Sequence, residues 1–213
     1  MLFKKSGFGP LWISYVLLLG CWPAHCYSQS SDGEAAYHIS FSPSKTGGTV
    51  VFSGPKHALA IDIVSDDIRT TDNPNYLIVD NRPFQASMVP LPNGIEGSSL
   101  PAARQKEILK SYVNYEMDYF QKEVKLATGQ LKLEYIPIGD TTFLLWTFHV
   151  GPAATGKSTG GGDTIVGQLY LSVLWHDQVL DLNCALTDLK DTEKARALLV
   201  RTAGTLRSLP DKK

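Results

Sequence analysis

The chain has 213 residues, 43% of them hydrophobic and 19% charged, a composition typical of a globular protein and not of a disordered one. Its length fits one domain, and its formal net charge of −1 comes from 20 basic and 21 acidic residues. No basic run interleaved with aromatic residues occurs, so neither nucleic acid nor an anionic lipid surface is favoured as a partner.

The first 28 residues have the layout of a signal peptide. Lys4 and Lys5 form a positive end, and the apolar run Leu11–Gly20 follows. This run is shorter than the about 20 apolar residues that cross a bilayer, and Pro23 interrupts the chain behind it. We therefore predict a cleavable signal peptide over residues 1–28 and an exported protein, either periplasmic or secreted.

Two processing sites compete. A cut after Ser28 places small residues, Cys26 and Ser28, at the positions that the signal peptidase reads. Alternatively, Leu18–Cys21 resembles a bacterial lipobox, which would lipidate Cys21 and anchor the protein to the membrane through that lipid alone. Leu19 departs from the small residue that is usual in a lipobox.

The number of cysteines in the mature chain depends on this choice. After a cut at Ser28 only Cys184 remains, whereas lipidation at Cys21 leaves Cys26 and Cys184, which could pair. Neither case is a disulfide framework, because a domain of this size can build a sufficient apolar core.

The first half of the mature chain is predicted as a lead-in and short strands. Residues 29–36 are small and polar, which is typical of a disordered lead-in. The strand-like runs are Tyr37–Phe41, Thr49–Ser53, Leu59–Val64, Tyr76–Val79 and Phe84–Val89. Between them we expect a turn over Ser42–Gly48, a polar loop over Asp66–Asn75 and an irregular connection over Pro90–Gly97.

A long amphipathic helix is predicted from Ala102 to about Ala127. Pro101 suits its opening turn, Ser99 is placed to cap it, and Gly129 ends it. One apolar stripe at helical spacing predicts packing against a sheet; its members are Ile108, Leu109, Tyr112, Val113, Tyr115, Tyr119, Phe120 and Val124.

Four strands and a closing helix are predicted after it. The strands are Leu131–Ile136, Thr141–Val150, Ile165–Trp175 and Val179–Leu186, and short turns make the neighbours in each hairpin antiparallel. One face of the third carries Leu169, Leu171, Val173 and Trp175, and one face of the fourth carries Leu180, Leu182, Cys184 and Leu186. The last helix runs from about Thr192 to Ser208, with Asp191 as a candidate cap and Pro210 behind it.

Together these elements predict a single α+β domain over residues 37–210, a largely antiparallel sheet covered by one long central helix and a C-terminal helix. The order of the helix Ala102–Ala127, the hairpins of Leu131–Leu186 and the closing helix Ala195–Leu209 resembles the PsbP-like sandwich, also seen in DcrB-type envelope lipoproteins. That resemblance implies a non-enzymatic envelope or assembly role and carries over no functional residue.

Gly151–Ser158 satisfies the P-loop pattern G-x-x-x-x-G-K-[ST], with Gly151, Gly156, Lys157 and Ser158 at the defining positions. In a P-loop, however, the loop runs into a helix whose N-terminus faces the phosphates. Here a glycine-rich stretch and then a strand follow Ser158, so the loop joins two antiparallel strands. We therefore predict that the match is false and that no nucleotide cofactor binds.

No other constellation predicts catalysis or metal binding. The histidines are scattered, and His176 and Asp177 could bind a metal with Asp181, but solvated turn residues explain them more simply, so no metal site is predicted. No G-x-S-x-G elbow occurs, and Cys184 sits on an apolar strand face as a packed thiol.

The sequence therefore favours an exported, non-enzymatic binding or assembly module of the cell envelope, whose partner is an envelope protein or a small ligand. The alternative is an enzyme, either a weak hydrolase or a nucleotide binder that uses Gly151–Ser158.

Overall fold

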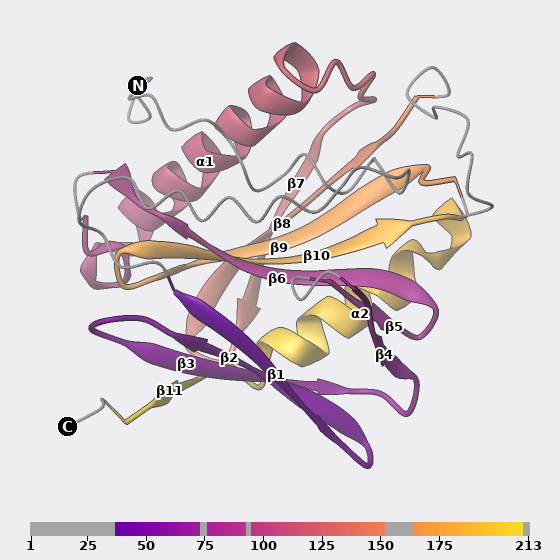
Figure 1. The fold of residues 1–213 in the computed structure, drawn as a ribbon. Coiled ribbons are helices and arrows are strands. Elements are labelled where there is room, and N and C mark those ends of the chain that lie inside the picture. The colour runs from indigo at the N-terminus through magenta and orange to yellow at the C-terminus, as the bar shows by residue number, and fades with distance from the viewer. Residues whose placement is uncertain (1–36, 73–75, 93–94, 152–163, 211–213) are drawn as a thin grey trace.

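The strands of the protein form two antiparallel sheets (Figure 1). The computed structural model describes residues 37–72, 76–92, 95–151 and 164–210. The four-stranded sheet has the order β1-β2-β3-β11, with β1 at His38–Ser44, β2 at Gly47–Ser53, β3 at Ala58–Val64 and β11 at Arg207–Leu209.

The seven-stranded sheet has the order β4-β5-β6-β10-β9-β8-β7. Its strands are β4 (Ile68–Thr70), β5 (Tyr76–Val79), β6 (Arg82–Pro90), β7 (Lys132–Ile138), β8 (Thr141–His149), β9 (Gly167–Trp175) and β10 (Gln178–Leu186). The α-helices of the described residues are α1 (Ala102–Lys122) and α2 (Thr192–Ala203), each preceded by a 3-10 turn, η2 (Gly97–Ser99) and η4 (Leu189–Asp191).

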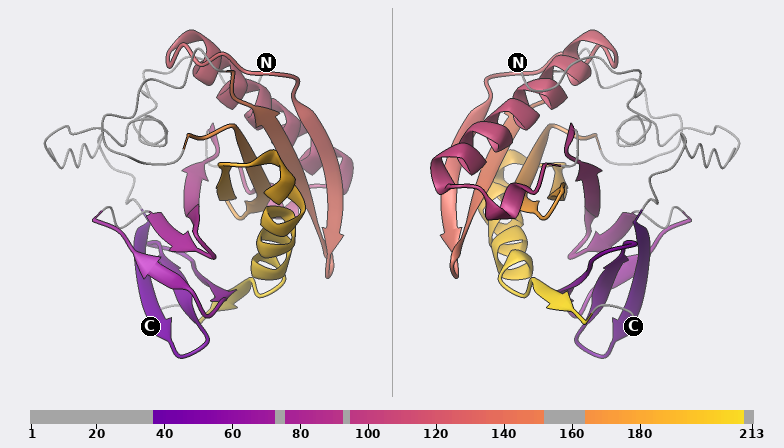
Figure 2. Two further views of the ribbon diagram at one scale, coloured as in Figure 1. Left: turned by 90° about the vertical axis from the view of Figure 1, so that its right-hand side faces the viewer. Right: turned by 90° about the vertical axis from the view of Figure 1, so that its left-hand side faces the viewer.

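The seven-stranded sheet is the middle layer of the molecule. In Figure 1, α1 lies above it, and α2 and the four-stranded sheet lie below it; Figure 2 shows the same layers from the two sides. The mixed α/β class with antiparallel sheets is therefore confirmed, although the strands divide between two sheets where one was expected.

The lower core lies between the two sheets and α2. Alternation along β9 and β10 predicted one apolar face on each strand. The predicted face of β9 and the predicted face of β10 both lie in this core. Leu171 and Leu182 are direct neighbours across the strands and are fully buried. Ala195, Leu198 and Leu199 of α2 close the core from the side.

The upper core lies between α1 and the opposite face of the same sheet. Trp146, Phe148 and Tyr170 form an aromatic group there, against Tyr112 and Phe120 of α1. Because both faces of the seven-stranded sheet are covered, β10 is buried along its whole length and β9 along nearly all of it.

Two expectations about the N-terminal half were wrong in detail. The predicted turn over Ser42–Gly48 is mostly strand, and β1 and β2 pair as far as Ser44 and Gly47. Pro43 fits because β1 is an edge strand, where a missing N–H costs no ladder hydrogen bond. The predicted loop Asp66–Asn75 contains the short strand β4, which pairs with β5.

The helix ends also differ from the sequence prediction. Ser99 does not cap α1; its hydroxyl donates to the Glu96 carbonyl, and Pro101 occupies the N-cap position. The helix stops at Lys122, and Lys125 adopts a φ of 59°, so the chain turns away before Gly129.

The closing helix is shorter than predicted as well. Asp191 makes no capping hydrogen bond, because its carboxylate pairs with Lys194 and Arg82. After Ala203 the chain leaves the helix and forms β11 on the open edge of β3. The Thr205 hydroxyl accepts from the Asp62 N–H at 2.7 Å, and Arg207 pairs with the Asp62 carboxylate, which holds this strand in place.

Candidate functional site

His57 stands in the turn between β2 and β3 of the four-stranded sheet. The Gly54 N–H donates to the His57 carbonyl at 2.9 Å and closes the turn. A Cβ at Gly54 would lie 2.6 Å from the ring of Tyr37, so only glycine lets that ring cover the turn. The backbone that carries His57 is therefore fixed by local contacts.

His176 stands in the two-residue turn between β9 and β10 of the seven-stranded sheet, with a φ of 52°. The segment that leaves β6 straps this turn: the Gly97 N–H donates to the His176 carbonyl at 2.6 Å, and the Leu91 N–H donates to the Asp177 carbonyl at 2.7 Å. A Cβ at Gly97 would lie 2.8 Å from a methyl carbon of Leu91 and 3.2 Å from the His176 carbonyl oxygen, so glycine fits here without a shift of its neighbours.

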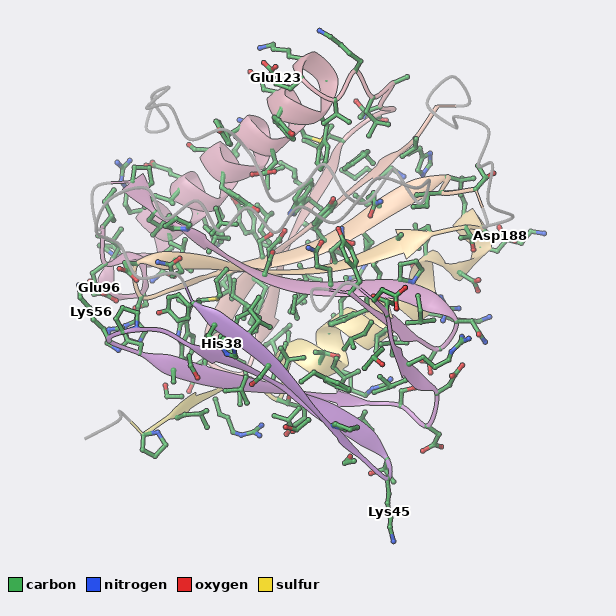
Figure 3. The ribbon with its side chains drawn as sticks, viewed as in Figure 1. His38, Lys45, Lys56, Glu96, Glu123 and Asp188 are labelled. Carbon is green, nitrogen blue, oxygen red and sulfur yellow. The ribbon has the colours of Figure 1, made fainter. Side chains whose placement is uncertain are left out.

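The same segment delivers Glu96, directly before Gly97. The Ser98 hydroxyl donates to Glu96 Oε1 at 2.8 Å and orients the carboxylate. Figure 3 shows Glu96 beside Lys56, the neighbour of His57, at one end of the molecule. The β2–β3 turn and the start of η2 thus meet there.

We call His57, Glu96 and His176 the junction cluster. The two imidazole rings stack with centroids 3.6 Å apart and an interplanar angle of 9°. His176 Nδ1 lies 3.0 Å from Glu96 Oε1, and one donor atom from each of the three side chains lies within 4.8 Å of the others. The side chains of His176 and Glu96 keep 31% and 46% of their exposure, so the cluster is open to solvent.

Two carboxylates, Asp177 and Glu96, act on the side chains around the junction cluster. The pKa of the Tyr37 hydroxyl is raised, first by burial and then by the carboxylates of Asp177 and Glu96. The indole of Trp175 meets His176 edge-on at 5.5 Å between ring centroids. A cation placed among these groups would be attracted by the two carboxylates.

The sequence analysis named His176, Asp177 and Asp181 as possible ligands of one metal ion. The structure does not bring these three residues together. Asp181 lies inside the upper core, where its carboxylate is bonded to Ser172 and Tyr112. His57 and Glu96 take its place near His176. The prediction that the chain holds no metal stays a prediction, and the junction cluster is the observation that stands against it.

A second group of titratable side chains lies in the upper core; the sequence analysis named Asp181 only as a possible metal ligand and did not identify Glu116. Glu116 of α1 and Asp181 of β10 are 3% and 5% exposed. Burial raises the pKa of Asp181 to about 7, although Ser172 and Tyr112 hydrogen bonds lower it in part. Burial, with the nearby Asp181 carboxylate, raises the pKa of Glu116 to about 8.

A short polar network holds Asp181. The Trp146 indole N–H donates to Ser172 Oγ at 2.8 Å, and the Ser172 hydroxyl donates to Asp181 Oδ1. The Tyr112 hydroxyl donates to Asp181 Oδ2 at 3.4 Å. Glu116 Oε2 has no hydrogen-bond partner among the described residues. These acids could accept protons, but they lie within the packed layer beneath α1.

The P-loop-like segment lies almost wholly outside the described residues, which stop at Gly151 and resume at Thr164. The Gly151 N–H donates to the Ala127 carbonyl at 2.7 Å. β8 and β9, the strands on either side, are antiparallel neighbours, as predicted. That the motif match is false stays a prediction.

Cys184 on β10 is fully buried and has no disulfide partner among the described residues, and burial raises the pKa of its thiol to about 12. The prediction of a packed thiol is confirmed. The two processing sites, Ser28 and Cys21, lie outside the described residues. Within the described ranges, neither α-helix has the length and apolar character needed to span a membrane.

The comparisons with known proteins assign no family. The sequence matches no protein-family model, and no curated protein is similar to it.

Proposed function

We propose that this chain is an exported domain that binds a partner or supports assembly in the cell envelope, without catalysing a reaction. The export half of the proposal is supported by the order of Lys4, Lys5 and the apolar run Leu11–Gly20. The anchor at Cys21 and the cut after Ser28 both remain compatible with it.

One observation supports the absence of catalysis. Groups with strongly shifted pKa values in an open cleft are the usual mark of an active site. Here the acids with raised pKa values, Glu116 and Asp181, are 3% and 5% exposed and are covered by α1. A substrate would have to displace the helix to reach them.

We also propose that the arrangement is a PsbP-like sandwich. This is supported by a central antiparallel sheet with α1 on one face and α2 on the other, in the same order along the chain. A non-enzymatic envelope role is what that resemblance implies.

The experiment uses the natural host. Mass spectrometry of the protein from its envelope should find a chain that begins at Gln29 or at a lipidated Cys21. An intact chain that begins at Met1 and stays in the cytoplasm would overturn the export half.

The absence of catalysis is tested by complementation: a strain that lacks the gene is given a copy in which the buried Glu116 is replaced. Glu116→Gln keeps the shape of the side chain, so it should restore the envelope phenotype of that strain as fully as the exposed control Glu123→Gln. A folded Glu116→Gln protein that fails to restore it would favour the enzyme.

A further inference from the structure

We propose that the junction cluster binds one divalent transition-metal ion, and that zinc is the ion its donors suit best. Two imidazole nitrogens and one carboxylate oxygen form a donor set that zinc accepts, with a fourth position left for water. The hard cations Mg²⁺ and Ca²⁺ prefer oxygen ligands alone. This inference goes beyond the proposed function and holds for any partner that the domain has.

The distances suit a metal centre that closes by small side-chain movements. Tetrahedral zinc with bonds of about 2.0–2.1 Å places its ligand atoms about 3.3 Å from one another. His176 Nδ1 and Glu96 Oε1 are already 3.0 Å apart, and the most distant pair of donors in the cluster is within 4.8 Å. We expect rotation of the side chains to close this difference.

The stacked rings define what must move. Two parallel imidazoles direct their in-plane lone pairs side by side, so one ring has to rotate before both can point at one ion. The half-open side chains have the room to do so, while the contacts at Gly54 and Gly97 hold the two turns still. The backbone is thus organised in advance, and the side chains adjust.

Metal binding replaces a proton at this site. In the metal-free protein the short contact between His176 Nδ1 and Glu96 Oε1 is a hydrogen bond. When the ion binds, a neutral His176 shifts this proton from Nδ1 to Nε2, whereas a ring that already carries a proton on Nε2 releases the Nδ1 proton to water; in both cases Nδ1 and Oε1 become ligands. Ser98 keeps its hydrogen bond to the carboxylate and supports it from outside.

The three ligands come from separate parts of the fold. His57 belongs to the four-stranded sheet, His176 to the seven-stranded sheet and Glu96 to the segment that leads into α1. An ion held by all three would tie the sheets together at one end, and it would stabilise the folded state because the unfolded chain lacks the site.

Calorimetric titration of zinc chloride into the chelator-stripped protein from its host tests the proposal. We expect one equivalent to bind, with affinity weakened at least about tenfold in His57→Ala, His176→Ala and Glu96→Gln. His149→Ala is the matched control, because this exposed histidine pairs with Gly167 at the opposite end of β9 from His176 and should change nothing. Magnesium chloride should give no binding.

Because loss of a stacked ring could disturb the turn, His57→Phe provides a second test. It keeps a ring on His176 and removes only the ligand nitrogen. At a zinc concentration about one hundred times the dissociation constant of the unaltered protein, the melting temperature of that protein should rise by about 5–10 °C, and that of His57→Phe should rise by at most about half as much.

Nuclear magnetic resonance supplies the geometric readout. Ring-current shifts of the two imidazoles should be present without zinc and disappear with it, because stacking ends when a ring turns to the ion. No zinc binding, or equal affinity in the unaltered protein and in His57→Phe, would overturn the proposal.

Discussion

Glu116 places a carboxyl group in an apolar layer, and the pH of the medium decides how much this costs. The folded carboxyl keeps its proton up to about pH 8, whereas the unfolded chain releases it near the ordinary value of 4.5. The folded state therefore holds more protons between these values, so the free energy of unfolding falls as the pH rises. The contribution is fully present below the lower value and lost as the pH passes the upper one.

We expect Glu116→Gln to flatten this dependence. At pH 5 the variant and the unaltered protein should melt at similar temperatures, and at pH 9 the variant should melt higher, because a neutral amide has no charge to bury. Thermal unfolding followed by circular dichroism from pH 5 to 9 measures this. Glu123→Gln, on the exposed end of α1, should follow the unaltered protein at every pH. A variant with the unaltered slope would show that Glu116 is not the group responsible.

Glu116 could not be predicted as buried, because the apolar residue next to it, Tyr115, fits the apolar stripe of the helix better. Tyr115 was assigned to the buried stripe, but this residue is 36% exposed, whereas Glu116 is buried with Tyr112 and Val113. Adjacent positions on a helix differ by about 100°, so a stripe drawn from apolar residues alone can pass beside a buried acid. Nothing in the residue types marks which of the two faces the sheet.

The junction cluster could not be predicted for a different reason. Its three residues come from two turns and a connection, and Glu96 and His176 are 80 positions apart in the chain. Only the packing of the two sheets brings these turns to one place. The available indication was weak: histidines in tight turns beside glycines that a side chain would crowd.

At the level of elements, period-2 alternation predicted β9 and β10 and the face of each that lies in the lower core. It did not predict that the opposite face, which carries the polar residues Ser172, Asp181 and Asn183, is buried as well. Helix ends were predicted less well. They depended on Lys125 taking a left-handed conformation and on β11 completing the edge of β3, and neither follows from local propensity.

Leu171→Ala and Leu182→Ala test the paired strands at the centre of the lower core. Both side chains are fully buried and face each other across β9 and β10. Each truncation should lower the free energy of unfolding by about 2–5 kcal/mol, because it removes buried methyl groups and leaves a cavity. Urea unfolding measures the loss, and Leu189→Ala, which is 42% exposed, is the control that should change little. An undisturbed Leu182→Ala protein would contradict the strand assignment.

The loop between β8 and β9 gives a prediction about nucleotides. A P-loop needs a following helix, and here the next described element is β9, antiparallel to β8. Calorimetry should detect no binding of ATP or GTP with Mg²⁺, and Lys157→Ala should leave the circular dichroism spectrum unchanged. Micromolar, magnesium-dependent binding that disappears in Lys157→Ala would reverse our interpretation of the motif.

For the molecule as a whole, the seven-stranded sheet is shared by both cores. Every residue of β10 is buried, with side chains alternating between the layer under α1 and the layer against the four-stranded sheet. Loss of either layer would expose one face of this strand to water. We therefore expect residues 37–210 to unfold as one cooperative unit.

This two-sided sheet also gives the protein a pair of built-in optical probes. Four tryptophans occur in the chain, and Trp12 and Trp22 lie in the segment predicted to be removed on export. Of the other two, Trp146 is sealed in the upper core, where its ring stacks on Tyr170 at 3.9 Å, and Trp175 packs against the lower core beside His176. The two tryptophans therefore report on opposite faces of the seven-stranded sheet.

Single-emitter variants use this arrangement. In Trp175→Phe the fluorescence comes from the layer under α1, and in Trp146→Phe it comes from the layer between the sheets. Within each variant, the emission and the circular dichroism should change at the same urea concentration if the seven-stranded sheet and the layers on its two faces unfold together. If the emission of one tryptophan shifts at a clearly lower urea concentration than the dichroism, the layer that contains this tryptophan unfolds first. Trp175 lies next to the junction cluster, so its fluorescence intensity should also change when an ion binds there, whereas the fluorescence of Trp146 should not change.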